Sequence, residues 1–279
     1  MRRKYIVSGS LILLTGLILH ADGPDVPSSD PVRLAQRQVA RYLAKLADLH
    51  CTEVVTQQKL NAKGHADSTE RSQFDYLIMM NGSNESFQLN ESRIESPDAK
   101  HKSVSMPMLT TNGMTTLLLV FHPYYSDAFS FDEGPEQIIQ NKIAVPIHFA
   151  HISGRRTPAA LALRGREFPL ELKGTAWLDK ASGQVIQADA SLMRDMSDVG
   201  LRSLEIHVEY KPESLGIETW TLPSKAVIDV ITPRQHWRNT HAFESYKSFS
   251  TDAQQDPNYK VRPDAPAQST DQPIPKEQQ

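Results

Sequence analysis

The chain has 279 residues, of which 39% are hydrophobic and 23% charged, slightly polar for a globular protein. Its formal net charge is −3, so no basic field attracts phosphate backbones, and we expect no nucleic-acid partner. The single cysteine, Cys51, excludes an internal disulfide and a metal cluster built from several thiolates.

The first 21 residues have the pattern of an export signal. Basic residues 2–4 precede an apolar run, residues 5–19, that is shorter than the roughly 20 apolar residues needed to cross a bilayer. We therefore predict a signal peptide at 1–21 and a periplasmic or secreted protein, peripheral to a membrane at most. Leu19 occupies the −3 position, where a small residue is preferred, so an uncleaved N-terminal anchor is the alternative.

An amphipathic helix follows a polar, proline-bearing linker at 22–31. Ser29 or Asp30 can cap this helix, and Pro31 suits its first turn. Apolar residues then recur at spacings of three and four: Val32, Ala35, Val39, Tyr42, Leu43 and Leu46. The pattern predicts a helix packed on a core, with a membrane-surface helix as the alternative.

From Cys51 onward the apolar residues follow a period of two, which is that of a β-strand. The expected strands are 51–59, 73–80, 85–94, two pieces of 138–152 around Pro146, 174–179, 184–192, 204–211, 220–231 and 237–249. Residues 61–70 have the composition of an exposed hairpin loop, and 81–84 and 180–183 are turns. The sequence therefore predicts a mainly β (α+β) fold, an antiparallel meander with one solvated face.

Residues 104–121 interrupt this pattern with a methionine-rich apolar segment. We expect a short helix over 112–122, ended by Pro123. Methionine suits surfaces that accept variable apolar partners, so the segment is either a mobile lid or a helix fixed in the core.

After Thr251 the chain becomes polar. Residues 252–279 contain too few large apolar groups to offset their ordering entropy, which predicts a disordered tail. One domain, residues 32–251, thus lies between the linker and the tail.

The sequence contains no recognisable catalytic motif. His148 and His151 are three residues apart in an expected strand, which directs them to opposite faces, poor geometry for one metal ion. We therefore predict no catalytic residue, no metal site and no cofactor.

Several segments resemble a known family. They are an amphipathic helix leading into the strand that begins Cys-Thr-Glu-Val-Val, the pieces at 174–179 (GTAWLD) and 182–186 (SGQVI), and the dipeptide Leu222-Pro223. In these the chain resembles the LolA/LolB-like superfamily of bacterial outer-membrane lipoprotein carriers, and more closely an uncharacterised exported branch of it, over about residues 32–250.

The resemblance implies an incomplete β-barrel wrapped around the N-terminal helix and a short central helix, whose apolar concave face receives acyl chains in the carriers. It also implies a lid held shut by contacts between an arginine and the lid backbone. The candidates for that arginine are Arg93, Arg155, Arg156 and Arg164.

We therefore expect an exported, monomeric, non-catalytic protein that binds a lipid or a lipoprotein acyl chain in the concave face of a half-barrel. The alternative is a cell-envelope interaction or sensing module that docks a partner protein through the same fold. The residues expected to line the ligand site or form its lid are Tyr76, Ile78, Met80, Met114, Leu117, Leu118, Phe121, Leu204, Ile206 and Val208.

Overall fold

A computed structural model of the chain describes residues 30–83, 86–95, 111, 116–163 and 165–248. The chain divides after Asp30, and the fold described below is that of the unit that begins at Pro31. The predicted signal peptide, the predicted tail and all but the last two residues of the predicted linker lie outside the described residues.

The described residues form a β-rich unit with few helical turns. The helices are α1 (Pro31–Leu46), α2 (Thr116–Leu119) and the 3-10 turns η1 (Ser126–Ala128) and η2 (Ser197–Val199). The strands are β1 (Leu49–Leu60), β2 (Ala66–Ser83), β3 (Ser86–Glu95), β4 (Phe129–Glu133), β5 (Gln137–Ile139), β6 (Lys142–His151), β7 (Ala160–Leu163), β8 (Arg166–Pro169), β9 (Leu172–Asp179), β10 (Val185–Leu192), β11 (Ser203–Leu215), β12 (Glu218–Ile231) and β13 (His236–Ser248).

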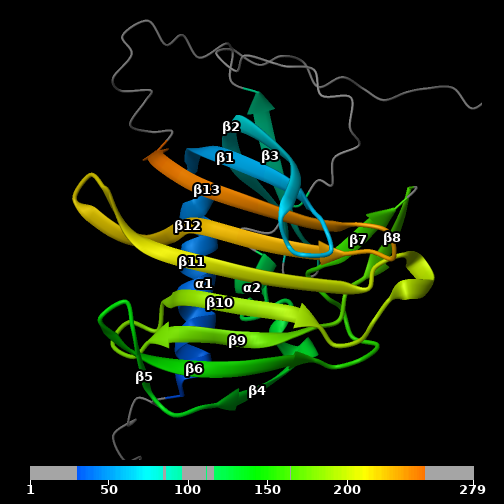
Figure 1. Ribbon diagram of the computed structural model, residues 1–279. Helices are drawn as coiled ribbons and strands as arrows, with labels where there is room; N and C mark the ends of the chain where they lie inside the picture. The colour runs from blue at the N-terminus through cyan, green and yellow to red at the C-terminus, as the bar shows by residue number, and fades with distance from the viewer. Residues whose placement is uncertain (1–29, 84–85, 96–110, 112–115, 164, 249–279) are drawn as a thin grey trace, which may run out of the picture. The chain divides into compact units, whose positions relative to one another are not determined.

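All strands except the β7–β8 hairpin belong to one antiparallel sheet (Figure 1). Its order is β3-β2-β1-β13-β12-β11-β10-β9-β6-β4, and β5 pairs with β6 next to β4. The first strand thus pairs with the last, while β3 and β4 remain the two edges of the described sheet. This open, curved sheet confirms the predicted incomplete β-barrel with helices.

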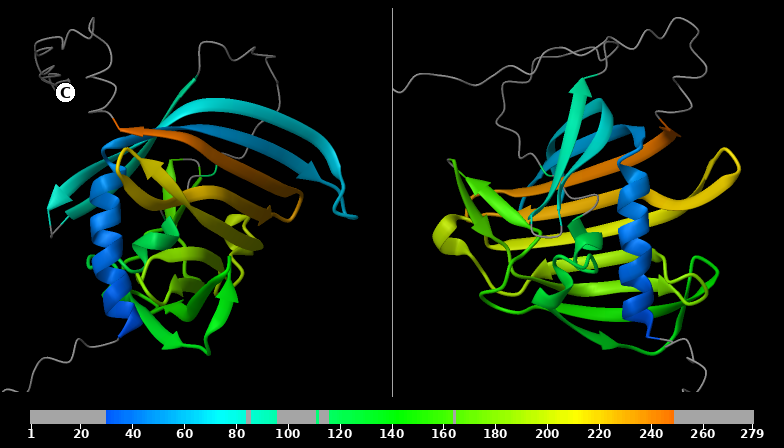
Figure 2. Two further views of the ribbon diagram at one scale, coloured as in Figure 1. Left: turned by 90° about the vertical axis from the view of Figure 1, so that its left-hand side faces the viewer. Right: turned by 180° about the vertical axis from the view of Figure 1, so that it is seen from behind.

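Both α-helices lie against the same, concave face of the sheet (Figure 2). Helix α1 buries Ala35, Val39, Leu43 and Leu46 on this face, and its Arg33, Arg37 and Arg41 are exposed. The predicted stripe therefore packs on the core of this unit, as the first of the two interpretations expects.

Strand β11 shows most clearly which face of the sheet is buried. Leu204, Ile206, Val208 and Tyr210 are buried in the core with the helices, while the intervening Glu205 is exposed. The predicted alternation is confirmed, and the inward side chains belong to the concave face.

The loop predicted for residues 61–70 is much shorter than expected. Strand β2 already begins at Ala66 and pairs with β1 from Ala66 to Leu77. Asn61 closes the turn, because its Oδ1 accepts hydrogen bonds from the backbone N–H groups of Lys63 and His65. The first half of β2 is polar and largely exposed, so its composition resembles a loop although its backbone is paired.

The break predicted at Pro146 is also displaced, because Pro146 lies inside the continuous strand β6. On one side β6 pairs with β9; on the other it pairs with β5 up to Ala144 and with β4 from Ile147. Pro146 occupies the gap between these two partners, where its missing N–H costs no ladder hydrogen bond. Its carbonyl accepts one from Gly134.

The helix expected over 112–122 is described only as the single turn α2. Residues 112–115 lie outside the described residues. Beyond Leu119 the N–H groups of Phe121 and His122 bond to carbonyls three residues back, so the helix gives way to a tighter turn three residues before the predicted end.

The predicted hairpin at 180–183 joins β9 to β10 and contacts α1. Asp179 fixes the turn, because its Oδ1 accepts from Ala181 N–H and its carbonyl from Gly183 N–H. Gly183 has φ +69°, and a Cβ atom added there would lie 2.3 Å from Cγ of Leu34. This glycine lets the hairpin touch the helix.

We expect Gly183→Ala to destabilise the fold more than the matched change Gly216→Ala. Both glycines have positive φ, a cost of about 1–2 kcal/mol for alanine, but only Gly183 faces a neighbouring side chain, which adds about 1–3 kcal/mol of overpacking. Urea unfolding of the two variants measures the difference. Equal losses would mean that the hairpin does not pack on α1.

Candidate functional site

The concave face brings together the predicted lining residues. Tyr76 and Ile78 on β2, Leu204, Ile206 and Val208 on β11, and Leu117, Leu118 and Phe121 in and after α2 are all at most 8% exposed and share one core. Met114 lies outside the described residues, as does the side chain of Met80. The described part of the lid-or-core segment is thus packed as core; whether these residues line a ligand site stays a prediction.

A small pocket lies at the border of this core, between α1 and strands β10, β11 and β12. Its volume is about 20 Å³, enough for roughly one water-sized group. Its lining is Gln38, Val39, Tyr42, Leu118, Gln184, Val185, Tyr210, Trp220 and Thr221. Only Leu118 belongs to the predicted set, although the sequence patterns had already placed Tyr42 on the helix stripe and Tyr210 on the inward face.

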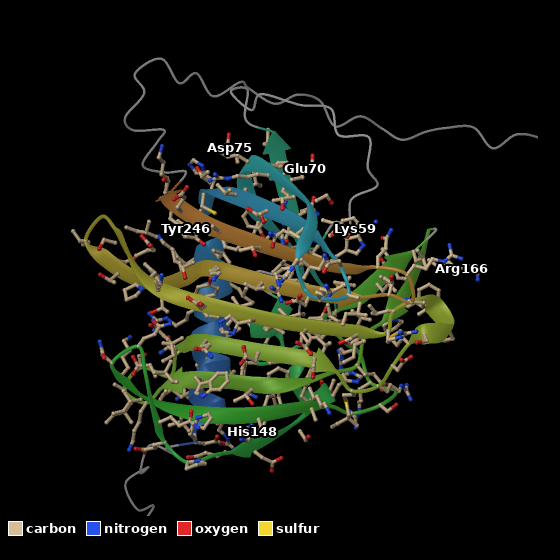
Figure 3. All side chains as sticks on the ribbon, viewed as in Figure 1. Lys59, Glu70, Asp75, His148, Arg166 and Tyr246 are labelled. Atoms are coloured by element: carbon tan, nitrogen blue, oxygen red, sulfur yellow. The ribbon has the colours of Figure 1, made fainter. Side chains whose placement is uncertain are left out.

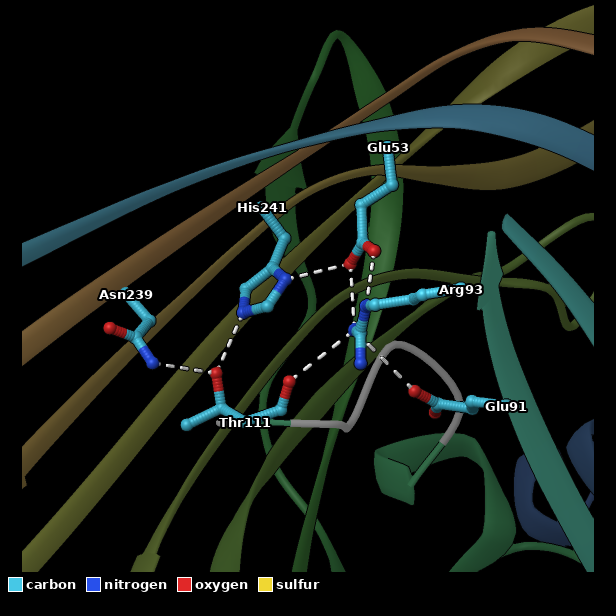
Figure 4. Close-up of polar contacts among 6 residues, drawn as sticks. All are labelled: Glu53, Glu91, Arg93, Thr111, Asn239 and His241. Carbon is cyan, nitrogen blue, oxygen red and sulfur yellow. Dashed lines mark hydrogen bonds and ion pairs between the residues drawn. The ribbon is translucent and has the colours of Figure 1, made fainter. Parts of the chain in front are cut away.

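One polar cluster interrupts the apolar concave face (Figure 4). Glu53 on β1 is fully buried and receives two hydrogen bonds from the guanidinium of Arg93 on β3. Its Oε1 also lies 2.8 Å from Nδ1 of His241 on β13. Strands β3 and β13 are not neighbours, so the buried carboxylate joins side chains from three strands.

The cluster holds one residue of the segment between β3 and α2. Arg93 Nη2 donates to the backbone carbonyl of Thr111 at 3.3 Å. The Thr111 hydroxyl lies 2.8 Å from Nε2 of His241 and accepts from Asn239 Nδ2 at 2.9 Å. We call these five residues, Glu53, Arg93, Thr111, Asn239 and His241, the Thr111 latch.

Among the candidate arginines, Arg93 has the contact that the resemblance implies, a hydrogen bond to a backbone carbonyl in the methionine-rich segment. Arg155 and Arg156 are largely exposed and lie beside Asp127 instead. Arg164 lies outside the described residues.

The sequence patterns did not identify Glu53 or His241 as site residues. Glu53 occupies an inward position of β1, between the buried Cys51 and Val55. A carboxylate at an inward position of an alternating strand was the available signal, because a buried charge requires a partner.

Burial alone raises the pKa of Glu53, but hydrogen bonds from Arg93 and His241, and their positive charge, outweigh burial and hold its pKa below the ordinary value. Glu53 is therefore ionised near neutral pH. A buried ion pair stabilises a fold only when its hydrogen bonds are complete, which is the arrangement seen here.

The outer face of the sheet is polar and solvated (Figure 3). A depression of about 500 Å³ over β9 to β12 is larger than the inner pocket, and it is lined by polar and charged side chains, among them Asp189 and His207, which bond to each other. His148 is exposed there, with Nδ1 2.8 Å from the Thr175 hydroxyl, while His151 is buried. The two histidines face opposite sides, as their spacing predicts.

Within the ranges described above, no three or more His, Cys, Asp or Glu side chains are grouped in a way that could hold a metal ion. In the same ranges, no helix combines the length and the apolar character needed to cross a membrane.

No protein-family model matches the chain, and neither does any curated protein sequence. Similar solved structures include a DUF1329 family protein from Desulfovibrio piger (9% identity, TM-score 0.43, covering 79% of this chain and 94% of that one). They also include a LolA superfamily protein from Nitrosomonas europaea (10%, 0.36, 76% and 93%). A third is an outer membrane lipoprotein-sorting protein domain from Vibrio parahaemolyticus (7%, 0.38, 77% and 94%). The set includes the LolA superfamily, as the sequence predicts.

We expect Glu53→Gln to remove up to about 3–5 kcal/mol of stability near pH 7, because Arg93 loses its bidentate partner and keeps only the longer ion pair with Glu91, at 3.8 Å. In the wild type, the folded-state pKa of Glu53 lies below the unfolded value of about 4.3. Its contribution is therefore present above pH 4.3 and is lost as the pH falls through the lower folded value. The variant lacks this acid-dependent loss.

Urea unfolding between pH 7 and pH 2 measures both effects. Asp189→Asn is the matched control, because it removes a carboxylate bonded to a histidine on the solvated face and should cost at most about 1 kcal/mol. Equal losses in the two variants at pH 7 contradict a structural role for the buried pair.

Proposed function

We propose that this protein is an exported carrier that binds the acyl chain of a lipid or lipoprotein in the concave face of its half-barrel, by burial and without catalysis. Two structural neighbours, a LolA superfamily protein and an outer membrane lipoprotein-sorting protein domain, support the same class. The observation that carries the proposal is the Thr111 latch, on an otherwise apolar face.

The latch supports a movable cover over this face more than a fixed core. An apolar cluster of the same size would stabilise a permanent core as well or better, because the buried charges of Glu53 and Arg93 must be desolvated. A directional polar contact instead fixes one position of a segment and can be broken as a unit. Thr111, which the latch holds, lies close to α2 in the sequence, and α2 with the turn after it supplies three of the predicted lining residues.

Binding requires part of this interior to be vacated, since the pocket holds only about one water-sized group. Burying about 14 methylenes contributes roughly 11 kcal/mol. Displacing Leu117, Leu118 and Phe121 costs roughly 1.5–3 kcal/mol each. The difference of about 2–6.5 kcal/mol corresponds to weak, reversible binding, with a dissociation constant between tens of millimolar and tens of micromolar, and a carrier must release its cargo.

Native mass spectrometry of the full chain, purified from a bacterial periplasm, tests the proposal. We expect a stoichiometric lipid or acylated peptide, identified after organic extraction. A clean apo mass, with no uptake of added phospholipid or lipopeptide, would contradict the carrier.

That second outcome would favour a docking module for a partner envelope protein. An exposed pair of isoleucines favours the docking module. Ile138 on β5 and Ile143 on β6 lie opposite each other and are 79% and 54% exposed. Together with the nearly filled pocket under α1, this pair gives the docking interpretation its structural basis.

Weakening the latch should increase apparent lipid affinity. Thr111→Val keeps the side-chain shape and removes the hydroxyl that contacts His241 and Asn239, so the closed form loses about 1 kcal/mol and binding tightens by about fivefold. Lipid titration followed by native mass spectrometry measures the change. Thr175→Val, which removes the contact with His148 on the outer face, is the control and should have no effect. Equal affinities for both variants would contradict a gating role of Thr111.

A further inference from the structure

The pocket under α1 contains polar groups that apolar burial does not explain. Its wall includes buried apolar side chains such as Val39 and Val185, and also Gln38, Gln184 and Trp220, which are partly exposed. The pocket therefore lies where the apolar interior approaches the surface beside α1, which crosses the strands at this place (Figure 2).

Two tyrosine hydroxyls in this pocket lack a hydrogen-bond partner. Tyr42 comes from α1 and Tyr210 from β11, and both hydroxyl oxygens are buried and unpartnered among the described residues. Tyr210 as a whole is 1% exposed. A buried hydroxyl without a partner is destabilising, and native proteins contain few of them unless a ligand or a water completes the bond.

Both hydroxyls are donors at neutral pH. Burial raises the pKa of each phenol well above its ordinary value, and Tyr210 contributes to the shift of Tyr42, so the two phenols are near each other. A neutral phenol donates one hydrogen bond, and a carbonyl oxygen has two lone pairs that accept two. The space of about 20 Å³ fits a group of that size.

One neighbouring acceptor in the pocket lining is occupied. Gln184 already accepts a hydrogen bond from the hydroxyl of Thr221 at 2.6 Å. Leu118 lines the pocket and also belongs to the main core. Its displacement would therefore connect the pocket with the interior of the concave face.

We propose that Tyr42 and Tyr210 form a subsite for the carbonyl oxygen of an acyl ester or acyl amide, whose chain continues past Leu118 into the concave face. The subsite rests on the proposed carrier function and adds to it the chemical group that is recognised. It makes this protein selective for acylated molecules over alkyl chains that lack a carbonyl.

The test compares three probes that share a sixteen-carbon chain, at concentrations below micelle formation: 1-palmitoyl lysophosphatidylcholine, its 1-O-hexadecyl ether analogue and an N-palmitoyl tripeptide. The full-length wild type and the double variant Tyr42→Phe/Tyr210→Phe are titrated by native mass spectrometry. Phenylalanine keeps the ring packing and removes the unpartnered hydroxyls, so the variant should fold. Tyr124→Phe is the control, because it also removes a tyrosine hydroxyl, but Tyr124 lies beside Phe87 and Arg156, outside the lining of this pocket and outside the predicted ligand lining.

We expect the double variant to bind the ester, the amide or both about tenfold more weakly, with unchanged affinity for the ether and no effect of Tyr124→Phe. The probe whose affinity falls identifies an ester or an amide as the natural source of the carbonyl. With a ¹³C-labelled carbonyl, the infrared stretch of the bound probe should lie lower in the wild type than in the double variant.

If all probes bind equally to the wild type and the double variant, the subsite is overturned while the carrier function stands, and the hydroxyls hold only a trapped water. If no probe binds to the wild type, the carrier function fails and the subsite fails with it. A carbonyl stretch that is the same in both proteins also overturns the subsite.

Discussion

The fold depends on covering the concave face of a single curved sheet. Strands of an antiparallel sheet direct alternate side chains to opposite faces, so every strand from β2 round to β6 contributes apolar groups to the inside of the curve. Helix α1 and the turn α2 supply the cover, and without them these side chains would meet water. Because β1 pairs with β2 on one side and with β13 on the other, the strand that directly follows α1 lies inside the sheet, between strands from the two ends of the described chain.

A charged cluster inside such a face costs desolvation free energy, so the Thr111 latch requires an explanation beyond stability. Glu53 is completely buried, yet it stays ionised because Arg93 and His241 bond to it from two different strands. Arg93 and His241 both also contact Thr111. The ordered side chains of the latch therefore hold Thr111 at a defined position in the interior.

The fold class followed from local patterns. The stripe of α1 and the alternation of β11 are set by residue order alone, since burying them requires only a period of 3.6 or 2. Boundaries were less accurate where composition and pairing disagree. The polar half of β2 has the composition of a loop because both of its faces are solvated. Proline suggests a strand break because it lacks an N–H, but Pro146 lies opposite the gap between β4 and β5, which only the pairing of the neighbouring strands reveals.

The site was predictable only in its apolar part. Leu117, Leu118 and Phe121 stood out as a hydrophobic run, and the structure packs them against the inward residues of β2 and β11. The polar partners come together from positions 53, 93, 111, 239 and 241, and the two pocket tyrosines from 42 and 210. The sequence by itself determined which residues turn inward, because the period of each element decides that locally. Only the tertiary structure decided which inward residues meet, because strand order and curvature bring distant segments together at distances that no local pattern contains.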